Sequence, residues 1–276
     1  MAVTVDRVKY SGRGITSGSA INMLVEKRPA GHGIVFELFN EGELNQGVKP
    51  EAPGVRVNAQ ASYVVNTMRN VVLGAQGKRL CIVEHFLAAC TLWGLDDLWV
   101  GIDGPELPLG DGSAKFFIDL FEQAGWDCKR VEPTISITEP IVVSKGDRQL
   151  LALPSDGFSA SYMMDWNHPL IGKRWRTWAP SEDIRQIADA RTFGPLKEHQ
   201  LLGIADQVVS LTESGFSHEL RFEDEPVRHK ILDLIGDLRL CGINPLALKA
   251  RFISIKAGHE MDVEMAKRLI DLLAKS

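Results

Sequence analysis

Two short segments of the chain combine residue types that bind metal ions and activate water. His229 and Asp233 are four residues apart, so on a helix both side chains stand on one face, close enough to hold a single ion. Asp237, one turn further on, continues that face and can support the two groups. The same spacing also fits an ordinary His–Asp pair on a solvent-exposed helix. Spacing alone leaves both interpretations open.

The second segment places Glu84 and His85 inside the apolar stretch 82–89. A carboxylate there is costly to bury without a partner, and the plain alternative is a salt-bridged glutamate beside a core histidine. Added to His229 and Asp233, His85 completes a His₂Asp set, which leaves a coordination position open for water as catalytic zinc requires. Glu84 then lies beside a ligand without being one, where a general base would be useful.

Three further segments carry weaker signals. His259 follows a glycine between a predicted strand and a predicted helix, a position found at the rims of active sites and in ordinary surface loops. Thr192 offers a hydroxyl in the loop-like segment 191–194. The segment 173–176, Lys-Arg-Trp-Arg, pairs cations with an indole and could meet phosphate or lipid headgroups, but we interpret it as a solvated loop.

Hydrophobic periodicity predicts the elements that position these groups. Apolar residues recur at three- and four-residue steps over 82–93 and 226–241, which predicts two buried helices carrying the candidate ligands. A strand at 248–256 and a final helix at 261–274 place His259 in the turn between them. Several antiparallel strands and two helices in each half are typical of an α+β fold used twice. Strands and helices do not alternate one for one, which argues against a doubly wound parallel sheet.

The polar segment 128–134 contains Pro133 and is the best candidate for a domain boundary. We therefore predict two domains, residues 1–128 and 133–276. The composition agrees with this organisation, because 276 residues that are 45% hydrophobic and 24% charged can form one large globular domain or two ordinary ones.

Charge and cysteine usage narrow the function classes. A net charge of −5 without a basic arm argues against nucleic acid as the main partner. The four cysteines form no CxxC pair, which favours a reduced protein. Residues 1–6 lack the pattern of a signal peptide, and the most apolar stretch, 81–95, is interrupted by charge and too short to span a bilayer. We therefore expect a cytoplasmic protein.

From about Gly12 to near its end, the chain resembles the UDP-3-O-acyl-N-acetylglucosamine deacetylase family, the zinc-dependent amidases of lipid A (lipopolysaccharide) biosynthesis. The motifs that carry the resemblance are IVEH at 82–85, DGPELP at 103–108, DGSA at 111–114, ARTFG at 190–194, RFEDEPVRHKILDLIGD at 221–237 and KAGH at 256–259. The resemblance implies two similar α+β domains, each a mainly antiparallel sheet with helices, and the helices packed between the two sheets.

The resemblance also implies a metal site and its chemistry. The implied ion is zinc, with Fe²⁺ as an alternative in cells, and the implied ligands are His85, His229 and Asp233. Glu84 would be the base, and His259, partnered by Asp237, the cationic acid that protonates the leaving amine. The reaction would be hydrolysis of an N-acetyl amide with release of acetate.

Further matched positions imply contacts with the substrate, a UDP-linked acylated amino sugar. Thr192 would help bind the oxyanion, Lys230 and Phe193 would contact the sugar, and Lys256 would reach the nucleotide diphosphate. The family implies no nucleic acid partner and at most peripheral contact with a membrane, and we expect a monomer.

Two features depart from the family's pattern. The family usually has a histidine where this chain has Thr16. The segment 195–220, which in the family forms a hydrophobic passage for the acyl chain, is shorter than expected and lacks a glycine-serine-aspartate stretch. Recognition of the acyl chain is therefore expected to differ, and a diverged deacetylase of another N-acetylated sugar is an alternative function.

Two other function classes fit part of the pattern. His₂Asp is also the ligand set of non-haem iron oxygenases, but those usually carry it on strands, whereas His229 and Asp233 share one predicted helix. Bound iron with 2-oxoglutarate turnover would favour that class, and bound zinc with acetate release would not. A non-catalytic protein that binds nucleotide-sugar lipids is the second alternative, and it predicts binding without acetate release.

Overall fold

The structure is a computed structural model that describes residues 7–44 and 50–274. Residues 1–6, where a signal peptide was sought, lie outside the described part. The strands of the first half are β1 (Arg7–Arg13), β2 (Ala20–Lys27), β3 (Ile34–Leu38), β4 (Val55–Asn58), β5 (Val64–Asn66), β6 (Val72–Ala75), β7 (Lys78–Cys81) and β8 (Leu98–Ile102). Those of the second half are β9 (Ile135–Ser136), β10 (Ile141–Lys145), β11 (Arg148–Pro154), β12 (Ser159–Trp166), β13 (Gly172–Trp178), β14 (Phe193–Pro195), β15 (Val209–Leu211) and β16 (Leu248–Ile255). The helices are α1 (Glu84–Trp93), α2 (Lys115–Gln123), α3 (Arg185–Ala188), α4 (Leu196–Leu202), α5 (Glu225–Leu238) and α6 (His259–Leu273), with short 3₁₀ helices at Ala61–Tyr63, Arg239–Cys241 and Pro245–Ala247.

The two large sheets share one strand order. The first is ordered β1-β2-β8-β3-β4, and the second β10-β11-β16-β12-β13. In each sheet the last strand of its half lies in the middle, antiparallel to one neighbour and parallel to the other. The predicted α+β class with mainly antiparallel sheets is therefore confirmed. The boundaries 1–128 and 133–276 remain our proposal, supported by this repeated strand order.

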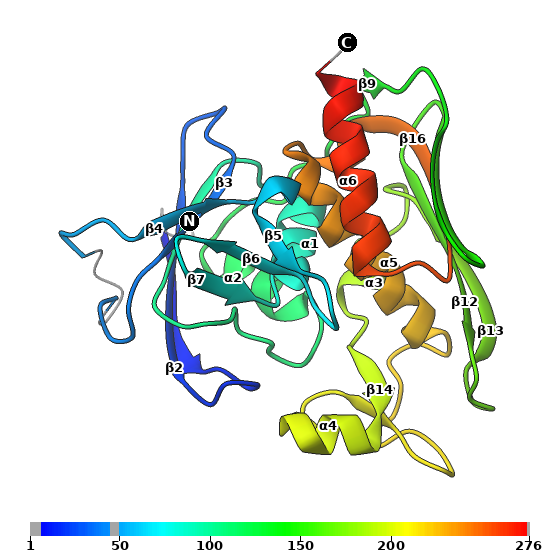
Figure 1. The fold of residues 1–276 in the computed structure, drawn as a ribbon, viewed down its shortest axis with the longest axis horizontal. Coiled ribbons are helices and arrows are strands. Elements are labelled where there is room, and N and C mark those ends of the chain that lie inside the picture. Colours follow the sequence, from blue (N-terminus) through cyan, green and yellow to red (C-terminus); the bar gives the residue numbers. More distant parts are fainter. Residues whose placement is uncertain (1–6, 45–49, 275–276) are drawn as a thin grey trace.

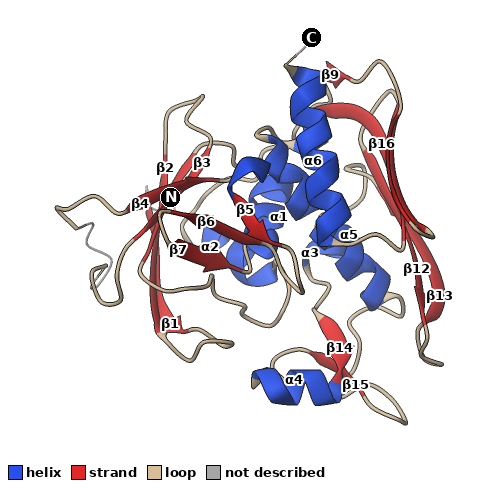
Figure 2. Ribbon diagram, in the orientation of Figure 1, coloured by secondary structure: helices blue, strands red, loops and turns tan. Residues whose placement is uncertain are grey.

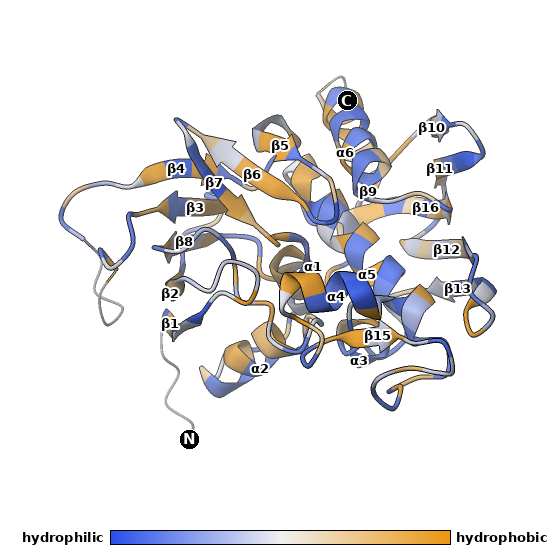
Figure 3. Cartoon of the chain, turned by 60° about the horizontal axis from the view of Figure 1, so that its bottom comes forward, coloured by the Kyte–Doolittle hydropathy of each residue, from blue (hydrophilic) through white to orange (hydrophobic). Residues whose placement is uncertain are grey.

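Helices α1, α5 and α6 lie between the two sheets (Figures 1 and 2). α5 of the second half packs against α1 of the first half, and it also contacts α6, α3, β12 and β13. One continuous cluster of buried apolar side chains therefore includes residues of both halves, among them Phe86 of α1 and Leu232 of α5. α6 is amphipathic, with a buried face that includes Met265 and Leu269, and Figure 3 shows hydrophobic residues mixed with hydrophilic ones along it. In the described part of the chain, no helix is both long and apolar enough to cross a membrane.

α1 and α5 approach each other most closely at Gly236. A Cβ atom placed on this glycine would lie 2.1 Å from the backbone oxygen of Glu84 and 3.2 Å from the backbone nitrogen of Ala88. Glycine is a poor residue for a helix interior, so its place here is explained by the close helix contact. This contact brings the start of α1, which carries Glu84 and His85, against the helix that carries His229 and Asp233.

The interpretation of residues 173–176 as a loop was wrong, because they belong to β13. β13 is the edge strand of the second sheet, paired only with β12 among the described strands. An edge strand tolerates charged side chains, which also protect it from pairing with other chains. Trp175 is 54% exposed, so the strand lacks the alternation of apolar and polar residues that predicts a half-buried strand.

We expect Gly236→Ala to destabilise the protein, although alanine favours helix by about 1 kcal/mol. The added methyl group would meet backbone rather than flexible side chains, and overpacking of this kind costs about 2 kcal/mol or more. Thermal unfolding of the variant should show a lower Tm, and metal binding should weaken because α1 is displaced from α5. Gly215→Ala is the matched control, since nothing lies within 4 Å of a Cβ at that position. Equal Tm values for the wild type and Gly236→Ala would contradict the tight contact.

Candidate metal centre and active site

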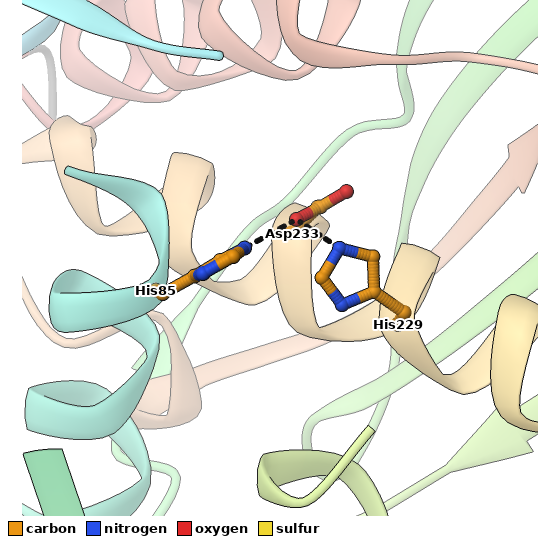
Figure 4. A group of neighbouring side chains, drawn as sticks. All are labelled: His85, His229 and Asp233. Atoms are coloured by element: carbon orange, nitrogen blue, oxygen red, sulfur yellow. Dashed lines mark ion pairs between the residues drawn. The ribbon is translucent and has the colours of Figure 1, made fainter. Parts of the chain in front are cut away.

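The three predicted ligands meet where α1 faces α5 (Figure 4). Asp233 Oδ1 lies 3.6 Å from His85 Nε2 and 3.4 Å from His229 Nε2. All three residues are almost fully buried. His229 and Asp233 are one helical turn apart as predicted, and His85 reaches them from the other half of the chain.

The spacing of these atoms fits a single metal ion. Ligand atoms bonded at about 2.0–2.2 Å to one tetrahedral zinc lie about 3.3–3.6 Å from each other, and both distances from Asp233 Oδ1 fall in this range. His229 Nδ1 lies 3.1 Å from the carbonyl oxygen of Ala190, so that nitrogen donates and Nε2 keeps its lone pair toward the centre. Burial lowers the pKa of His229 to about 4 against the opposing attraction of Asp233, so the imidazole is neutral at pH 7, as a metal ligand must be.

Lys230 holds the other oxygen of the carboxylate ligand. Its Nζ donates a hydrogen bond of 2.7 Å to Asp233 Oδ2. Burial opposes the charge on both groups. The attraction of Asp233 nevertheless raises the pKa of Lys230 above its usual value, and interactions with His229 and Lys230 hold the pKa of Asp233 well below its own. Lys230 is therefore a fixed cation beside the metal centre, where an anionic substrate group would be attracted.

Glu84 begins α1 and is almost fully buried. Its Oε2 accepts a hydrogen bond of 3.1 Å from the backbone nitrogen of Val71, in the segment before β6. This bond fixes one oxygen, and the side chain lines the same pocket as the three candidate ligands. Burying this carboxylate costs free energy, and the hydrogen bond from Val71 offsets part of that cost.

The sequence predicts a turn at His259. In the structure this residue is the first residue of α6. Its Nδ1 lies 2.7 Å from Asp237 Oδ2, across the contact between α5 and α6. Burial lowers the pKa of His259 and raises that of Asp237, but the attraction and the hydrogen bond between the two groups oppose both shifts and leave the pKa of His259 above its ordinary value. The imidazole is therefore cationic at neutral pH, with its Nε2 proton free of this hydrogen bond.

Thr192 is placed by a buried ion pair. Arg191 Nε lies 2.8 Å from Glu225 Oε1, and Glu225 is 1% exposed at the start of α5. The same carboxylate also accepts a hydrogen bond from the backbone nitrogen of Arg191. Thr192 Oγ1 donates to the carbonyl oxygen of Gly112 at 2.9 Å and lies 3.3 Å from His229 Nε2. The hydroxyl is thus held beside the ligand cluster by both halves of the chain.

Two pockets meet at this cluster. One, of about 300 Å³, is lined by polar groups that include Lys230, Lys256 and Tyr162. The other, of about 540 Å³, extends toward Ile204 and Leu202 near the β14–α4–β15 unit. The two share a border formed by Arg69, Trp166, Thr192, Phe193, His229, Asp233 and His259. A ligand with a polar end and an apolar end could therefore occupy both pockets with its middle at the metal centre.

The remaining predicted contact residues lie on the walls of these pockets. Phe193 packs against Trp166 with ring centroids 4.8 Å apart, and its ring meets that of His229 edge-on. Lys256 lies further out, with Nζ 2.9 Å from Asp147 Oδ2 and 3.4 Å from Asp165 Oδ2. Every predicted site residue except Asp237 thus lines one of the two pockets. Asp237 is hydrogen-bonded to His259, which lines both.

Comparisons with known proteins give the chain its family. The model of the UDP-3-O-acyl N-acetylglycosamine deacetylase family matches residues 3–271. The chain belongs to this family. A UDP-3-O-acyl-N-acetylglucosamine deacetylase of Leptospira biflexa is 35% identical over 94% of this chain and 86% of its own length. Proteins of the same name from Geotalea uraniireducens and Nostoc sp. are 33% and 32% identical, covering 98% and 97% of this chain and 87% and 97% of theirs.

Membership of this deacetylase family implies hydrolysis of an amide and confirms the resemblance seen in the sequence. Thr16, which stands where a histidine was expected from the resemblance, is fixed by hydrogen bonds. The Thr16 hydroxyl donates to Glu106, and Ser17 Oγ donates to the same carboxylate at 2.6 Å. Thr16 also lines the larger pocket.

The segment 195–220, expected from the sequence to be shorter than in the family, folds together with β14 into a distinct unit. β14 and β15 are parallel strands joined by α4, and they project from the body of the molecule at the bottom of Figure 1. Ile204 and Val208 pack here with Ile82 and Leu109 in an apolar cluster separate from the main core. The expected shortening therefore leaves an apolar wall in place beside the metal centre.

Sequence reasoning missed several residues of this site. Arg69 borders both pockets from a turn with a left-handed backbone, where φ is 70°, and its neighbours carry no motif that would have identified it. Glu225 lies within the motif at 221–237, but no local pattern connects it with Arg191, 34 residues away. His199, which carried no usable pattern, is buried beside the larger pocket with Nδ1 2.9 Å from Ser210 Oγ.

We expect Arg191→Lys to reduce turnover while leaving metal content unchanged. Lysine keeps the charge but not the planar fork that binds both oxygens of Glu225. The loop carrying Thr192 would lose its fixed position, and a misplaced group of this kind costs at least about tenfold in kcat. Arg130→Lys is the matched control, since its pair with Glu132 is solvent-exposed. Wild-type turnover in Arg191→Lys would contradict a positioning role for the ion pair.

Proposed function

We propose that this protein hydrolyses the N-acetyl amide of a UDP-3-O-acyl-N-acetylglucosamine-type substrate and releases acetate, as a zinc-dependent deacetylase of lipid A biosynthesis. The observation that carries the proposal is the meeting of a cationic pocket and an apolar pocket at the cluster of His85, His229 and Asp233. Family membership supports the reaction class. We further propose that the protein works in the cytoplasm as a monomer, with at most peripheral contact with a membrane.

The substrate's two ends would enter different pockets. The nucleotide diphosphate and the sugar would occupy the pocket that contains Lys230 and Lys256, whose charges attract phosphate. Phe193 would pack against the sugar at the border between the pockets. The 3-O-acyl chain would occupy the apolar pocket, where burial of each CH₂ group contributes about 0.8 kcal/mol.

A zinc ion held by His85, His229 and Asp233 would supply a Lewis acid for the amide carbonyl and lower the pKa of the attacking water toward ~7. Glu84, beside the ligand His85, would accept the proton that this water loses as it attacks the carbonyl carbon. The hydroxyl of Thr192 would turn from Gly112 to donate a hydrogen bond to the developing oxyanion.

The departing amine needs a proton, because an amide anion is a poor leaving group. His259 is cationic at neutral pH and would donate its Nε2 proton to the amine nitrogen while Asp237 holds Nδ1. Since Glu84 must be ionised and His259 protonated, activity should require both states at once. The basic limb of the pH profile should then reflect the raised pKa of His259.

Glu84→Ala and His259→Ala should both retain the fold and the metal but lose most acetate release, because each removes one of the two proton transfers. General acid–base groups contribute about 10²–10⁴-fold, and losses of that size are expected in kcat. The measurement is acetate release from substrates with and without a 3-O-acyl chain, repeated after chelation of the metal. Wild-type rates in both variants would contradict the mechanism, and binding without any acetate release by the wild type would favour a non-catalytic protein.

The apolar pocket generates a separate expectation for Ile204→Trp. The larger side chain would fill the space near Leu109 and Val208, and the acyl chain would be excluded. We expect kcat/KM to fall about tenfold or more for a substrate with a long 3-O-acyl chain, and to change little for one without an acyl chain. Leu201→Trp is the control, since Leu201 is 88% exposed on the neighbouring helix α4. An equal effect on both substrates would rule out this pocket as the acyl site.

A further inference from the structure

A second carboxylate lies beside His259. Asp262 is three residues further along α6, so the two side chains share one face of the helix. Asp237 approaches the same place from α5. One nitrogen or oxygen atom from each of the three side chains lies within 4.8 Å of those from the other two. None of the three belongs to the proposed ligand set, and the proposed mechanism gives Asp262 no role.

Asp262 is fully buried and unpartnered. Neither of its carboxylate oxygens makes a hydrogen bond within the described part of the chain, and the same holds for Asp237 Oδ1. Buried carboxylates are normally hydrogen-bonded, because an unmet charge in a dry interior is costly. Packing alone does not explain why the two buried carboxylate oxygens of Asp262 lack hydrogen-bond partners.

The burial of Asp262 works against folding. Burial raises the pKa of its carboxyl group to about 6, although the nearby cations His259 and Lys230 oppose the shift. The native state therefore binds this proton more tightly than the unfolded chain does. Its contribution to stability is lost as pH rises from the ordinary aspartate value of 3.8 through about 6, and the ionised group weakens the fold at neutral pH.

The charges around the pair come from several elements. His259 faces Asp237 and Asp233 on α5 and Glu84 on α1, and all three favour its protonated form. Asp262 is repelled by Asp233 and attracted by Lys230. Of the two carboxylates grouped with His259, those of Asp237 and Asp262, only Asp237 accepts a hydrogen bond within the described part of the chain.

We propose that Asp262 is a positioning residue that acts through His259, holding the imidazole in its protonated form together with Asp237. Asp237 fixes the ring by accepting the Nδ1 hydrogen bond, and Asp262 adds a nearby negative charge from the helix that also carries His259. The inference rests on the proposed function, in which His259 donates a proton. In that step the Nε2–H bond breaks, an N–H bond forms on the amine, and the electron pair of the broken C–N bond stays on the amine nitrogen. Asp262 takes no proton in the step.

The test is the titration of His259 in zinc-loaded protein, followed by NMR of isotope-labelled histidine. In Asp262→Asn the carboxylate is replaced by a neutral group of the same shape. We expect the pKa of His259 to fall by about one unit, as for loss of one close opposite charge. The basic limb of kcat/KM for acetate release should move to lower pH by the same amount, with little change in rate at pH 6.

Glu260→Gln is the matched control. Glu260 lies in the same turn of α6 and loses the same charge, but its side chain is 53% exposed and paired with Lys145. Solvent screens such a charge, so neither the His259 titration nor the pH profile should move. Asp262→Asn should also raise the Tm at pH 8 and leave it nearly unchanged at pH 4, since only the ionised carboxylate weakens the fold.

Two outcomes would overturn the proposal. One is a folded Asp262→Asn variant in which His259 titrates as in the wild type. The other is a loss of one of two bound zinc ions per chain on this substitution, which would make the three residues a metal site instead. The NMR titration needs no turnover, so a wild type that releases no acetate would remove the proposed function without deciding the role of Asp262.

Discussion

The close contact of α1 with α5 at Gly236 is the constraint on which the site depends. Two of the three candidate ligands are local neighbours on α5, and the third can join them only if α1 comes within backbone contact. A side chain at position 236 would occupy the place of the Glu84 carbonyl. The same contact therefore sets the positions of His85, a candidate ligand, and of Glu84, the proposed base.

Around this contact, ionised side chains of the site are each stabilised by an oppositely charged side chain from another helix or from the next turn of the same helix. Lys230 stabilises the carboxylate ligand, and Asp237 stabilises the cation of His259. Burial disfavours the charged form of each group. Each pair is nevertheless stable, because its two groups are close together and water does not screen their attraction. The site is thereby supplied at neutral pH with a fixed cation and a proton donor.

Local spacing indicated only part of the site and left its role open, and the resemblance to the family implied the roles of the other residues. His229 and Asp233 are one helical turn apart, and helical periodicity is the strongest pattern a sequence carries. Partners joined by tertiary contact were harder: Glu225 meets Arg191 only through the folding of a loop onto a helix. The fold class followed from counting strands and helices, whereas β13 was missed because an exposed edge strand has no apolar face to reveal it.

The repeated strand order has a consequence for how the molecule is built. β8 and β16 are each the last strand of their half, yet each lies in the middle of its sheet. During synthesis neither sheet can close until its final strand has emerged, and pairing of this non-local kind is intrinsically slow. The first half completes its sheet while α5 is still to be made, so the surface of α1 around Glu84 waits uncovered. The candidate metal centre therefore cannot form until α5, in the second half of the chain, has been made.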